Sequence, residues 1–404
     1  MRLISLLAAG VSAAACGATL YAAAPAKAPP PIANYWMDVA TTSGFGAGMG
    51  GQPSAAQVMA MMNGGGGSVG HTVDLRLASK TKAPASPQAD HWIPASLQMG
   101  PSLPLVTPVR EAAPPTPTGM PQGYQPKGRM LIYWGCGEHV SAGQPTVIDF
   151  AKVAAGQMPA GMKAMAAVAN VVSGPHGAPG FGRWPNDRDG RAVPAQGSLL
   201  GSHKVAGNYS PDIGFSLAAG QDFMPGLGLA EAGALPSGAA RLRWQPAAQA
   251  TGYALAMFGA NQGGDVIMWS SAKSAMMPHL DYLTPAEAKR QVAAGNVLPP
   301  SANECVLPAE VAAAVPMGMV TMIGYGPEAN FAEAPKAPKW TAKVRYKTTA
   351  SLMRGMGAMM GGGMDGGGQA MPARQQQQPQ KKKRRSLLGD IIQGATGIPV
   401  PEGE

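Results

Sequence analysis

The stretch Trp340-Thr-Ala-Lys-Val-Arg-Tyr-Lys347 decides the fold class. Its apolar and aromatic residues alternate with threonine and basic residues, which is typical of a strand with one buried and one solvated face. Residues 71–78 repeat this pattern, with Val73, Leu75 and Leu77 on one face. The sequence therefore predicts half-buried strands in two distant parts of the chain.

Further β-rich runs lie between these two strands, and we expect strands within 91–106, 129–134, 146–150, 242–244, 253–259 and 265–269. A short helix is expected after Thr284, which is spaced from Glu287 as in a capping box. Glycine and proline are abundant, at 55 and 39 of 404 residues, which favours long connections. The sequence thus predicts a mainly β fold: two β-sandwich-like domains in tandem with short helices, long Gly/Pro-rich linkers and a disordered C-terminal tail.

Changes in composition along the chain suggest where its parts begin and end. We expect a signal peptide at 1–26, a low-complexity lead at 27–70, a first β domain at 71–155, a connector at 156–197, a second β domain at 198–350, a disordered Gly/Met/Gln-rich segment at 351–380 and a basic amphipathic tail at 381–404.

One part of the second β domain resembles a known family. Leu242-Arg-Trp244 is followed by Pro246 and then by Ala250-Thr-Gly-Tyr253. Residues 241–272 therefore resemble a fibronectin type III or related immunoglobulin-like β-sandwich. The resemblance implies that four residues fill the space between two sheets: Trp244, Tyr253, Leu255 and Met257. The whole chain resembles an exported bacterial protein.

The N-terminal residues indicate export. Arg2 precedes the uncharged apolar run Leu3–Ala15, and small residues follow, which is the pattern of a signal peptide cleaved after Ala18 or Ala26. Ala13–Ala15 before Cys16 resembles a lipobox, so lipidation of Cys16 is an alternative. Both routes place the protein in the periplasm or cell envelope.

After cleavage of such a signal peptide, two cysteines would remain, Cys136 and Cys305. An even number of cysteines in an oxidising compartment makes this pair a disulfide candidate. Two separately buried thiols are the alternative, because sequence alone does not show that the sulfurs meet.

The C-terminal tail carries a run of five basic residues beside a short apolar helix face, and the whole chain has a net charge of +9. Such a pattern suits an anionic membrane or an envelope polymer, whereas the lack of interleaved basic and aromatic residues disfavours nucleic acid. A solvated tail that keeps the protein soluble is the alternative. The candidate surface-binding residues are Lys381, Lys382, Lys383, Arg384, Arg385, Leu387, Leu388, Ile391 and Ile392.

Methionine is frequent, with 26 residues, and Met353, Met356 and Met359 are spaced three apart. Thioethers are soft ligands that suit Cu(I), so a copper-handling protein is one alternative. Compositional bias of a disordered segment explains the same residues without a metal. The sequence predicts no other metal or cofactor site.

Motifs of known enzymes do not occur in a fitting context. Gly66–Gly70 matches the Gly-x-Ser-x-Gly nucleophile elbow but lies before a predicted strand, where the motif requires a helix. The sequence therefore favours a non-enzymatic envelope protein with a structural or binding role. The alternative is a secreted hydrolase whose site forms from distant residues, such as Asp212 or Asp222 near His203.

Overall fold

The computed structural model describes residues 30–45, 47, 69–108, 128–154, 157, 174–176, 178–275, 278–336 and 338–355. The predicted signal peptide, the lipidation candidate Cys16, residues 66–68 of the Gly66–Gly70 motif and the basic tail lie outside these residues. Of the three methionines proposed for copper, only Met353 is described.

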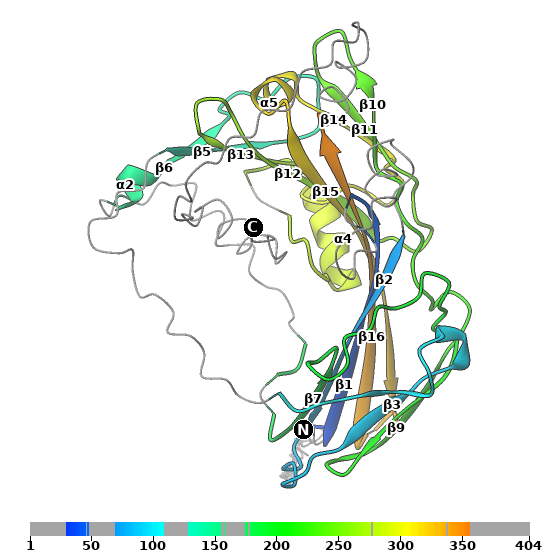
Figure 1. Ribbon diagram of the computed structural model, residues 1–404. Helices are drawn as coiled ribbons and strands as arrows, with labels where there is room; N and C mark the ends of the chain where they lie inside the picture. Colours follow the sequence, from blue (N-terminus) through cyan, green and yellow to red (C-terminus); the bar gives the residue numbers. More distant parts are fainter. Residues whose placement is uncertain are drawn as a thin grey trace, which may run out of the picture.

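The largest element of the fold is a strongly curved sheet of nine strands (Figure 1). From one edge to the other, its strands are β6 (Thr146–Asp149), β5 (Arg129–Trp134), β13 (Val266–Ser270), β12 (Gly252–Ala260), β15 (Gly318–Ala332), β16 (Trp340–Arg354), β1 (Ala33–Gly44), β2 (Gly70–Ser79) and β7 (Gly180–Trp184).

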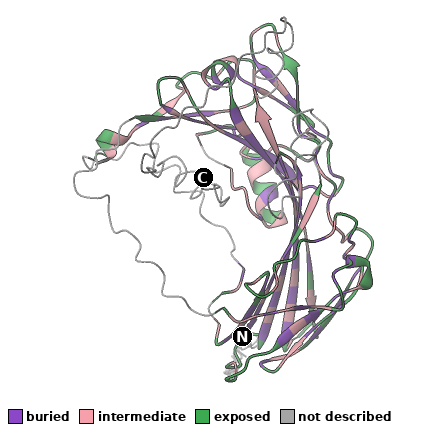
Figure 2. Ribbon diagram, viewed as in Figure 1, coloured by how far each residue is buried: buried purple, intermediate pink, exposed green. Residues whose placement is uncertain are grey.

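Two smaller sheets complete the β structure. One contains β4 (Ser102–Pro104), β3 (Ala89–Trp92), β8 (Gly201–Gly207) and β9 (Ser210–Leu217). The other contains β10 (Ala230–Ala234), β11 (Ala240–Arg243) and β14 (Glu304–Leu307). The main cluster of buried apolar side chains draws members from all three sheets, so both small sheets pack on the large one (Figure 2). The prediction of a mainly β, sandwich-like fold is confirmed.

The helices within the described residues are short. They are η1 (Ala95–Leu97), α2 (Phe150–Ala154), α4 (Pro285–Ala294) and α5 (Ala309–Ala314). The predicted start of α4 is confirmed, because the Thr284 side chain accepts a hydrogen bond from the Glu287 backbone N–H at 3.2 Å. The Glu287 carboxylate binds Arg290 and Gln291 within the helix. No helix among the described residues is long and apolar enough to cross a bilayer.

Strand β1 corrects the expectation of a low-complexity lead over 27–70. Its residues Ala33–Gly44 form an interior strand of the large sheet, third from the β7 edge, between β2 and β16. Val39, Ala40 and Thr41 are buried in succession, so both faces of β1 are covered at this point. Continuous burial weakens the alternating pattern that identifies a half-buried strand, which explains why sequence reasoning missed it.

The strands do not follow the tandem division of the sequence into 71–155 and 198–350. Strands β5 and β6 from the first range pair beside β13 from the second, in one continuous sheet. Strand β7 (Gly180–Trp184) lies in the expected connector over 156–197 and pairs with β2. Its glycines permit this, because a side chain on Gly182 would collide with the Tyr209 hydroxyl and the Leu105 carbonyl.

The core residues implied by the fibronectin-like resemblance are confirmed as core residues. Trp244, Tyr253, Leu255 and Met257 are all buried in the main cluster. The Trp244 and Tyr253 rings pack at 5.6 Å between centroids, and the Tyr253 hydroxyl accepts a hydrogen bond from the Ala247 backbone N–H at 2.7 Å. These side chains hold the three-stranded sheet against the nine-stranded sheet.

Candidate ligand-binding cleft on the large sheet

The face of β1, β2 and β16 that points away from the main core carries charged side chains. On β1, Tyr35, Met37 and Val39 enter the core, so Asp38 between them points to the opposite face. In the sheet register, Asp38 lies directly between Arg345 of β16 and Asp74 of β2. Three strands from distant parts of the sequence therefore place an Arg–Asp–Asp row across the sheet.

The centre of this row is a buried ion pair. Arg345 Nε donates to Asp38 Oδ1 at 2.6 Å and Nη2 contacts Oδ2, and their side chains are only 5% and 7% exposed. The guanidinium also lies between two aromatic rings, 4.6 Å from the Trp36 centroid and 4.5 Å from that of Tyr282. Bidentate pairing and cation–π contacts fix Arg345 in one position.

Two more exposed ion pairs flank the buried pair. Arg76 Nε lies 2.7 Å from Asp74 Oδ1 on β2, and Lys347 Nζ of β16 donates to Asp281 Oδ1 at 2.8 Å. Lys347 Nζ is also 4.3 Å from the centroid of the Tyr282 ring, and Tyr282 lies three residues before the start of α4 at Pro285. Asp281 and Tyr282 thus form a wall above the charged side chains of β2 and β16.

A cavity of about 530 Å³ lies among these side chains. Three acidic and three basic residues line it, and Tyr282, Gly174 and Pro185 contribute to its walls. A volume of this size suits a small ligand, and a few fixed polar groups on a rigid scaffold are typical of ligand sites. The charged lining residues are Asp38, Asp74, Arg76, Asp281, Arg345 and Lys347.

Asp74 and Asp281, the two partly exposed aspartates of the cleft, have pKa values that are shifted in opposite directions. Burial raises the pKa of the Asp74 carboxyl, the nearby Asp38 charge raises it further, and Arg76 opposes both effects. Burial also acts to raise the pKa of Asp281, but pairing with Lys347 outweighs it and leaves that pKa below its usual value. The cleft therefore holds one carboxyl that accepts a proton more readily than usual and one that releases it more readily.

A second polar cluster lies on the opposite, core-facing side of β1. The His203 Nε2–H donates to the Leu199 carbonyl at 2.7 Å, so the Nδ1 of neutral His203 accepts from the Nε2–H of His91 at 3.0 Å. The Nδ1 of His91 in turn accepts from the Tyr35 hydroxyl at 2.8 Å. The pKa values of both histidines are lowered, mainly by burial. We call these four residues the histidine chain.

The hydrolase site expected around His203 is not assembled. His203 points into the core, whereas Asp212 pairs with Lys204 on the exposed face of the same sheet, at 2.9 Å. Asp222 accepts hydrogen bonds from the Ser198 hydroxyl at 2.6 Å and from the Leu199 backbone at 2.9 Å, so it stabilises a loop. Side chains along β8 and β9 alternate between the two faces of the sheet, and this places His203 and Asp212 on opposite faces. The sequence alone could not show this, because it did not define the bounds of these strands.

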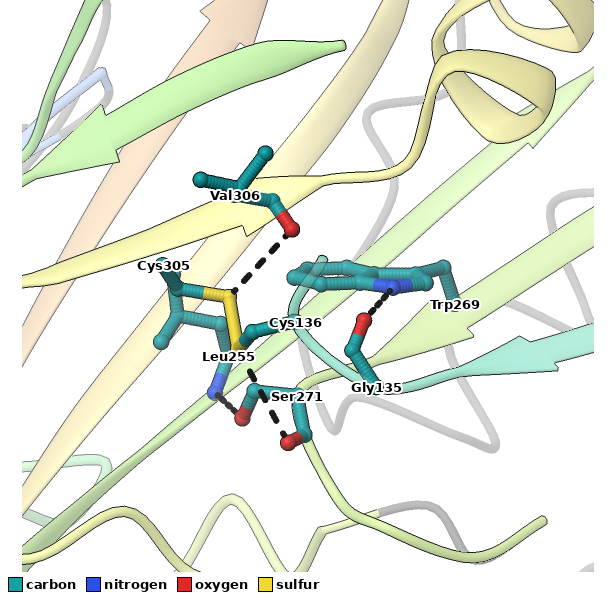
Figure 3. The surroundings of a disulfide bond; sticks show 7 residues. All are labelled: Gly135, Cys136, Leu255, Trp269, Ser271, Cys305 and Val306. Atoms are coloured by element: carbon teal, nitrogen blue, oxygen red, sulfur yellow. Dashed lines mark hydrogen bonds between the residues drawn. A yellow bond between two sulfur atoms is a disulfide. The ribbon is translucent and has the colours of Figure 1, made fainter. Parts of the chain in front are cut away.

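The disulfide candidate is formed in the structure. Cys136, just after β5, bonds to Cys305 on β14, with the Cα atoms 5.3 Å apart (Figure 3). Beside it, Trp269 Nε1–H donates to the Gly135 carbonyl at 3.0 Å, and the Gly137 N–H donates to the Val306 carbonyl at 2.9 Å. The bond links the large sheet to the three-stranded sheet across 169 residues of sequence.

Other candidates are placed as follows. Met353 lies on β16 opposite Met319 of β15, while Met356, Met359 and the tail residues 381–392 lie outside the described residues. Among the described residues, no group of three or more His, Cys, Asp or Glu could hold a metal ion. The cleft could not be predicted from the sequence beyond the alternation in β2 and β16, because the centre of the cleft depends on β1.

Comparison of the chain with protein-family models, with curated proteins and with solved structures finds no match. The resemblance of residues 241–272 to a fibronectin type III domain therefore stays a prediction.

Proposed function

We propose that this protein is an exported, non-enzymatic binding protein of the cell envelope, and that the cleft takes a small ligand carrying both charge signs. The observation that carries this proposal is the cavity of about 530 Å³ lined by three acidic and three basic side chains. Their balanced charge favours a zwitterion, such as a free amino acid or a short peptide, over a polyanion.

The three ion pairs have different parts in this proposal. The Asp38–Arg345 pair is buried and held between two rings, so it forms a fixed floor. Asp74 and Asp281 are 44% and 49% exposed, so their pairs with Arg76 and Lys347 can exchange partners at low cost. A ligand carboxylate would replace an aspartate on Arg76 or Lys347, and a ligand ammonium would pair with the aspartate released.

Calorimetric titration of the full chain with a panel of amino acids and dipeptides tests the cleft. We expect saturable binding that Asp281→Asn weakens about tenfold or more, because a charge-assisted contact to the ligand is lost. Asp212→Asn is the matched control, since Asp212 also pairs with a lysine but lies on another sheet. No binding by the wild-type chain, or equal effects of both variants, would contradict the proposal.

Export is supported by the disulfide, because such bonds persist in oxidising compartments. Fractionation of the native cell with N-terminal sequencing tests it. We expect the mature chain in the envelope fraction, beginning after Ala18 or Ala26, or at a lipidated Cys16. A full-length N-terminus in the cytoplasmic fraction would overturn this part of the proposal.

Tethering by the basic tail is supported by sequence alone, through the five consecutive basic residues of 381–385. Co-sedimentation at low salt with vesicles of phosphatidylcholine, with or without phosphatidylglycerol, tests it. We expect the full chain to bind only the anionic vesicles and a chain ending at residue 380 to stay in solution. Unchanged sedimentation after this deletion would show that the tail is not the anchor.

A hydrolase is the second candidate, favoured by one observation. Asp74 has a raised pKa and lies opposite Asp38, whose charge is held by Arg345. A carboxyl with a raised pKa beside a second carboxyl group is an arrangement that suits general acid catalysis. If turnover of chromogenic glycosides or esters is found, Asp74→Asn should reduce it by about 100-fold or more. Lack of turnover by the wild-type chain excludes this candidate for those substrates.

A further inference from the structure

The outward face of the four-stranded sheet carries an exposed tryptophan. Burial alternates along β3, where Ala89 and His91 are buried and Trp92 is 43% exposed. In the sheet, Trp92 lies between Ser102 of β4 and Lys204 of β8. An exposed apolar side chain by itself needs no explanation, so what surrounds the indole decides its meaning.

Small side chains dominate the sheet surface beside Trp92. Ser202 and Ser216 contact each other through their hydroxyls at 3.3 Å, and the outward side of Gly214, opposite Lys204, is open. Trp92 is flanked by Ser102 and Lys204, and the nearby outward positions Ser202, Gly214 and Ser216 carry small side chains, so the indole projects from a low surface. We call this surface, made by Trp92, Ser102, Ser202, Lys204, Gly214 and Ser216, the Trp92 platform.

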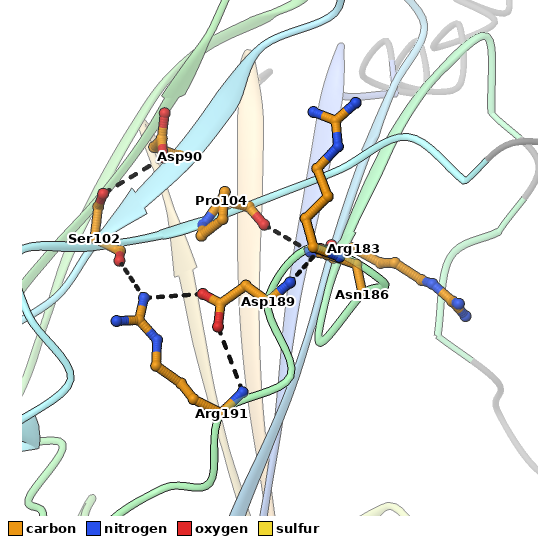
Figure 4. Close-up of polar contacts among 8 residues, drawn as sticks. Asp90, Ser102, Pro104, Arg183, Asn186, Asp189 and Arg191 are labelled. Atoms are coloured by element: carbon orange, nitrogen blue, oxygen red, sulfur yellow. Dashed lines mark hydrogen bonds and ion pairs between the residues drawn. The ribbon is translucent and has the colours of Figure 1, made fainter.

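A polar network borders the platform on the β4 side (Figure 4). The Ser102 hydroxyl donates to Asp90 Oδ1 at 3.4 Å, and the Ser102 carbonyl accepts from Arg191 Nη2 at 3.3 Å. Arg191 is itself held by the Asp189 carboxylate at 2.9 Å. Hydrogen-bonding groups therefore stand at fixed positions beside the indole.

The charges around the platform do not attract a polyanion. Lys204 is paired with Asp212 at 2.9 Å and Arg191 with Asp189, while Asp90 adds a further acidic group. Of these five charged residues, three are acidic and two are basic, so they supply no positive excess of the kind that nucleic acids and anionic lipids require. A neutral partner rich in hydroxyl groups fits this balance.

We propose that the Trp92 platform binds a neutral polysaccharide. The C–H groups on one face of a pyranose ring are slightly positive, so they pack on the electron-rich face of the indole. The ring hydroxyls then reach Asp90, Ser102 and Lys204 at the edges of the platform. This site lies on a different sheet from the charged cleft and does not depend on it.

Affinity electrophoresis of the full chain through gels containing a soluble neutral β-glucan, or through alginate gels as an anionic counterpart, tests the proposal. We expect retardation by the β-glucan only, and we expect Trp92→Ala to weaken it about tenfold or more, as truncation of a binding hot spot does. Trp92→Tyr should keep most of the retardation, because an aromatic face remains. Val147→Ala, which truncates a side chain 44% exposed on the large sheet, is the matched control and should change nothing.

Other outcomes overturn the proposal. Lack of retardation of the wild-type chain by the β-glucan, or equal retardation of Trp92→Ala, would remove the platform as a glycan site. Dimerisation in analytical ultracentrifugation, or vesicle binding, that disappears in Trp92→Ala would show that the indole contacts a second copy or a lipid surface instead. Amino acid binding in the cleft should be equal in wild type and Trp92→Ala, so the two sites fail or succeed separately.

Discussion

The two sides of β1 solve the problem of buried polar groups in different ways. On the cleft side, Asp38 and Arg345 remain charged because each neutralises the other at close range. On the core side, His91 and His203 form no ion pair with any acidic residue that the structure describes, so they stay neutral and form hydrogen bonds in series. A buried charge therefore depends on its partner, whereas the histidine chain depends on its protonation state.

The largest expected effect on stability comes from removing the Asp38–Arg345 ion pair on the cleft side of β1. Arg345→Met should lower the free energy of unfolding by about 3–5 kcal/mol, because Asp38 would be left buried without its counter-charge. Urea denaturation followed by tryptophan fluorescence measures this. The double variant Asp38→Leu with Arg345→Met is the control and should recover most of the loss. A loss below about 1 kcal/mol in the single variant would mean that water reaches Asp38.

Disrupting the histidine chain on the core side of β1 should lower the free energy of unfolding by somewhat less. His203→Ala leaves the His91 Nε2–H and the Leu199 carbonyl without their partner and opens a cavity, so we expect a loss of about 3 kcal/mol in the same assay. His203→Phe keeps the volume and removes only the hydrogen bonds, so its loss should be smaller. Equal losses in the two variants would show that the hydrogen bonds, and not the packing, carry the effect.

The pH dependence of stability should distinguish the two sides further. The pKa values of His91 and His203 lie below 6.5, so the unfolded state takes up protons first as the pH falls below that value. The free energy of unfolding should therefore decrease from pH 7 to pH 5, and the double variant His91→Gln with His203→Gln should reduce this slope, with His71 and His279, whose pKa values are also lowered by burial, supplying the rest.

Asp281→Asn is the control for this slope. The pKa of Asp281 is lowered from 3.8, so its contribution is lost only as the pH falls below about 4, and the variant should retain the wild-type slope between pH 7 and pH 5. Burial raises the pKa of Asp74, so protonation of Asp74 opposes the histidines and favours the folded state in acid. Stability that is constant from pH 7 to pH 5 would contradict the neutral state of the histidine chain.

The smallest effect is expected for an ion pair outside both regions. Lys204 and Asp212 are 58% and 65% exposed, so Lys204→Ala should change the free energy of unfolding by less than about 1 kcal/mol. Lys204 directly follows His203 on β8, so denaturation of these two neighbouring variants compares the exposed and buried faces of one strand. A loss equal to that of His203→Ala would mean that strand disruption, and not burial, determines both results.

Parts of the fold and little of the site were predictable from the sequence. The run 129–134 was predicted with the bounds of β5, and the alternation after Trp340 was predicted with its buried face. These predictions succeeded because a strand covered on one face shows its burial in every second residue. The Arg–Asp–Asp row and the histidine chain were missed, since their members are separated by up to 307 residues.

The sequence by itself determined the mainly β class and the start of α4 at Thr284. Those features depend on neighbouring residues or on composition, which a single chain displays directly. Only the tertiary structure decided that β1 pairs in parallel with β16, which sets Asp38 beside Arg345. Register between distant strands is fixed by how all the sheets pack together, and no local pattern in the chain carries that information.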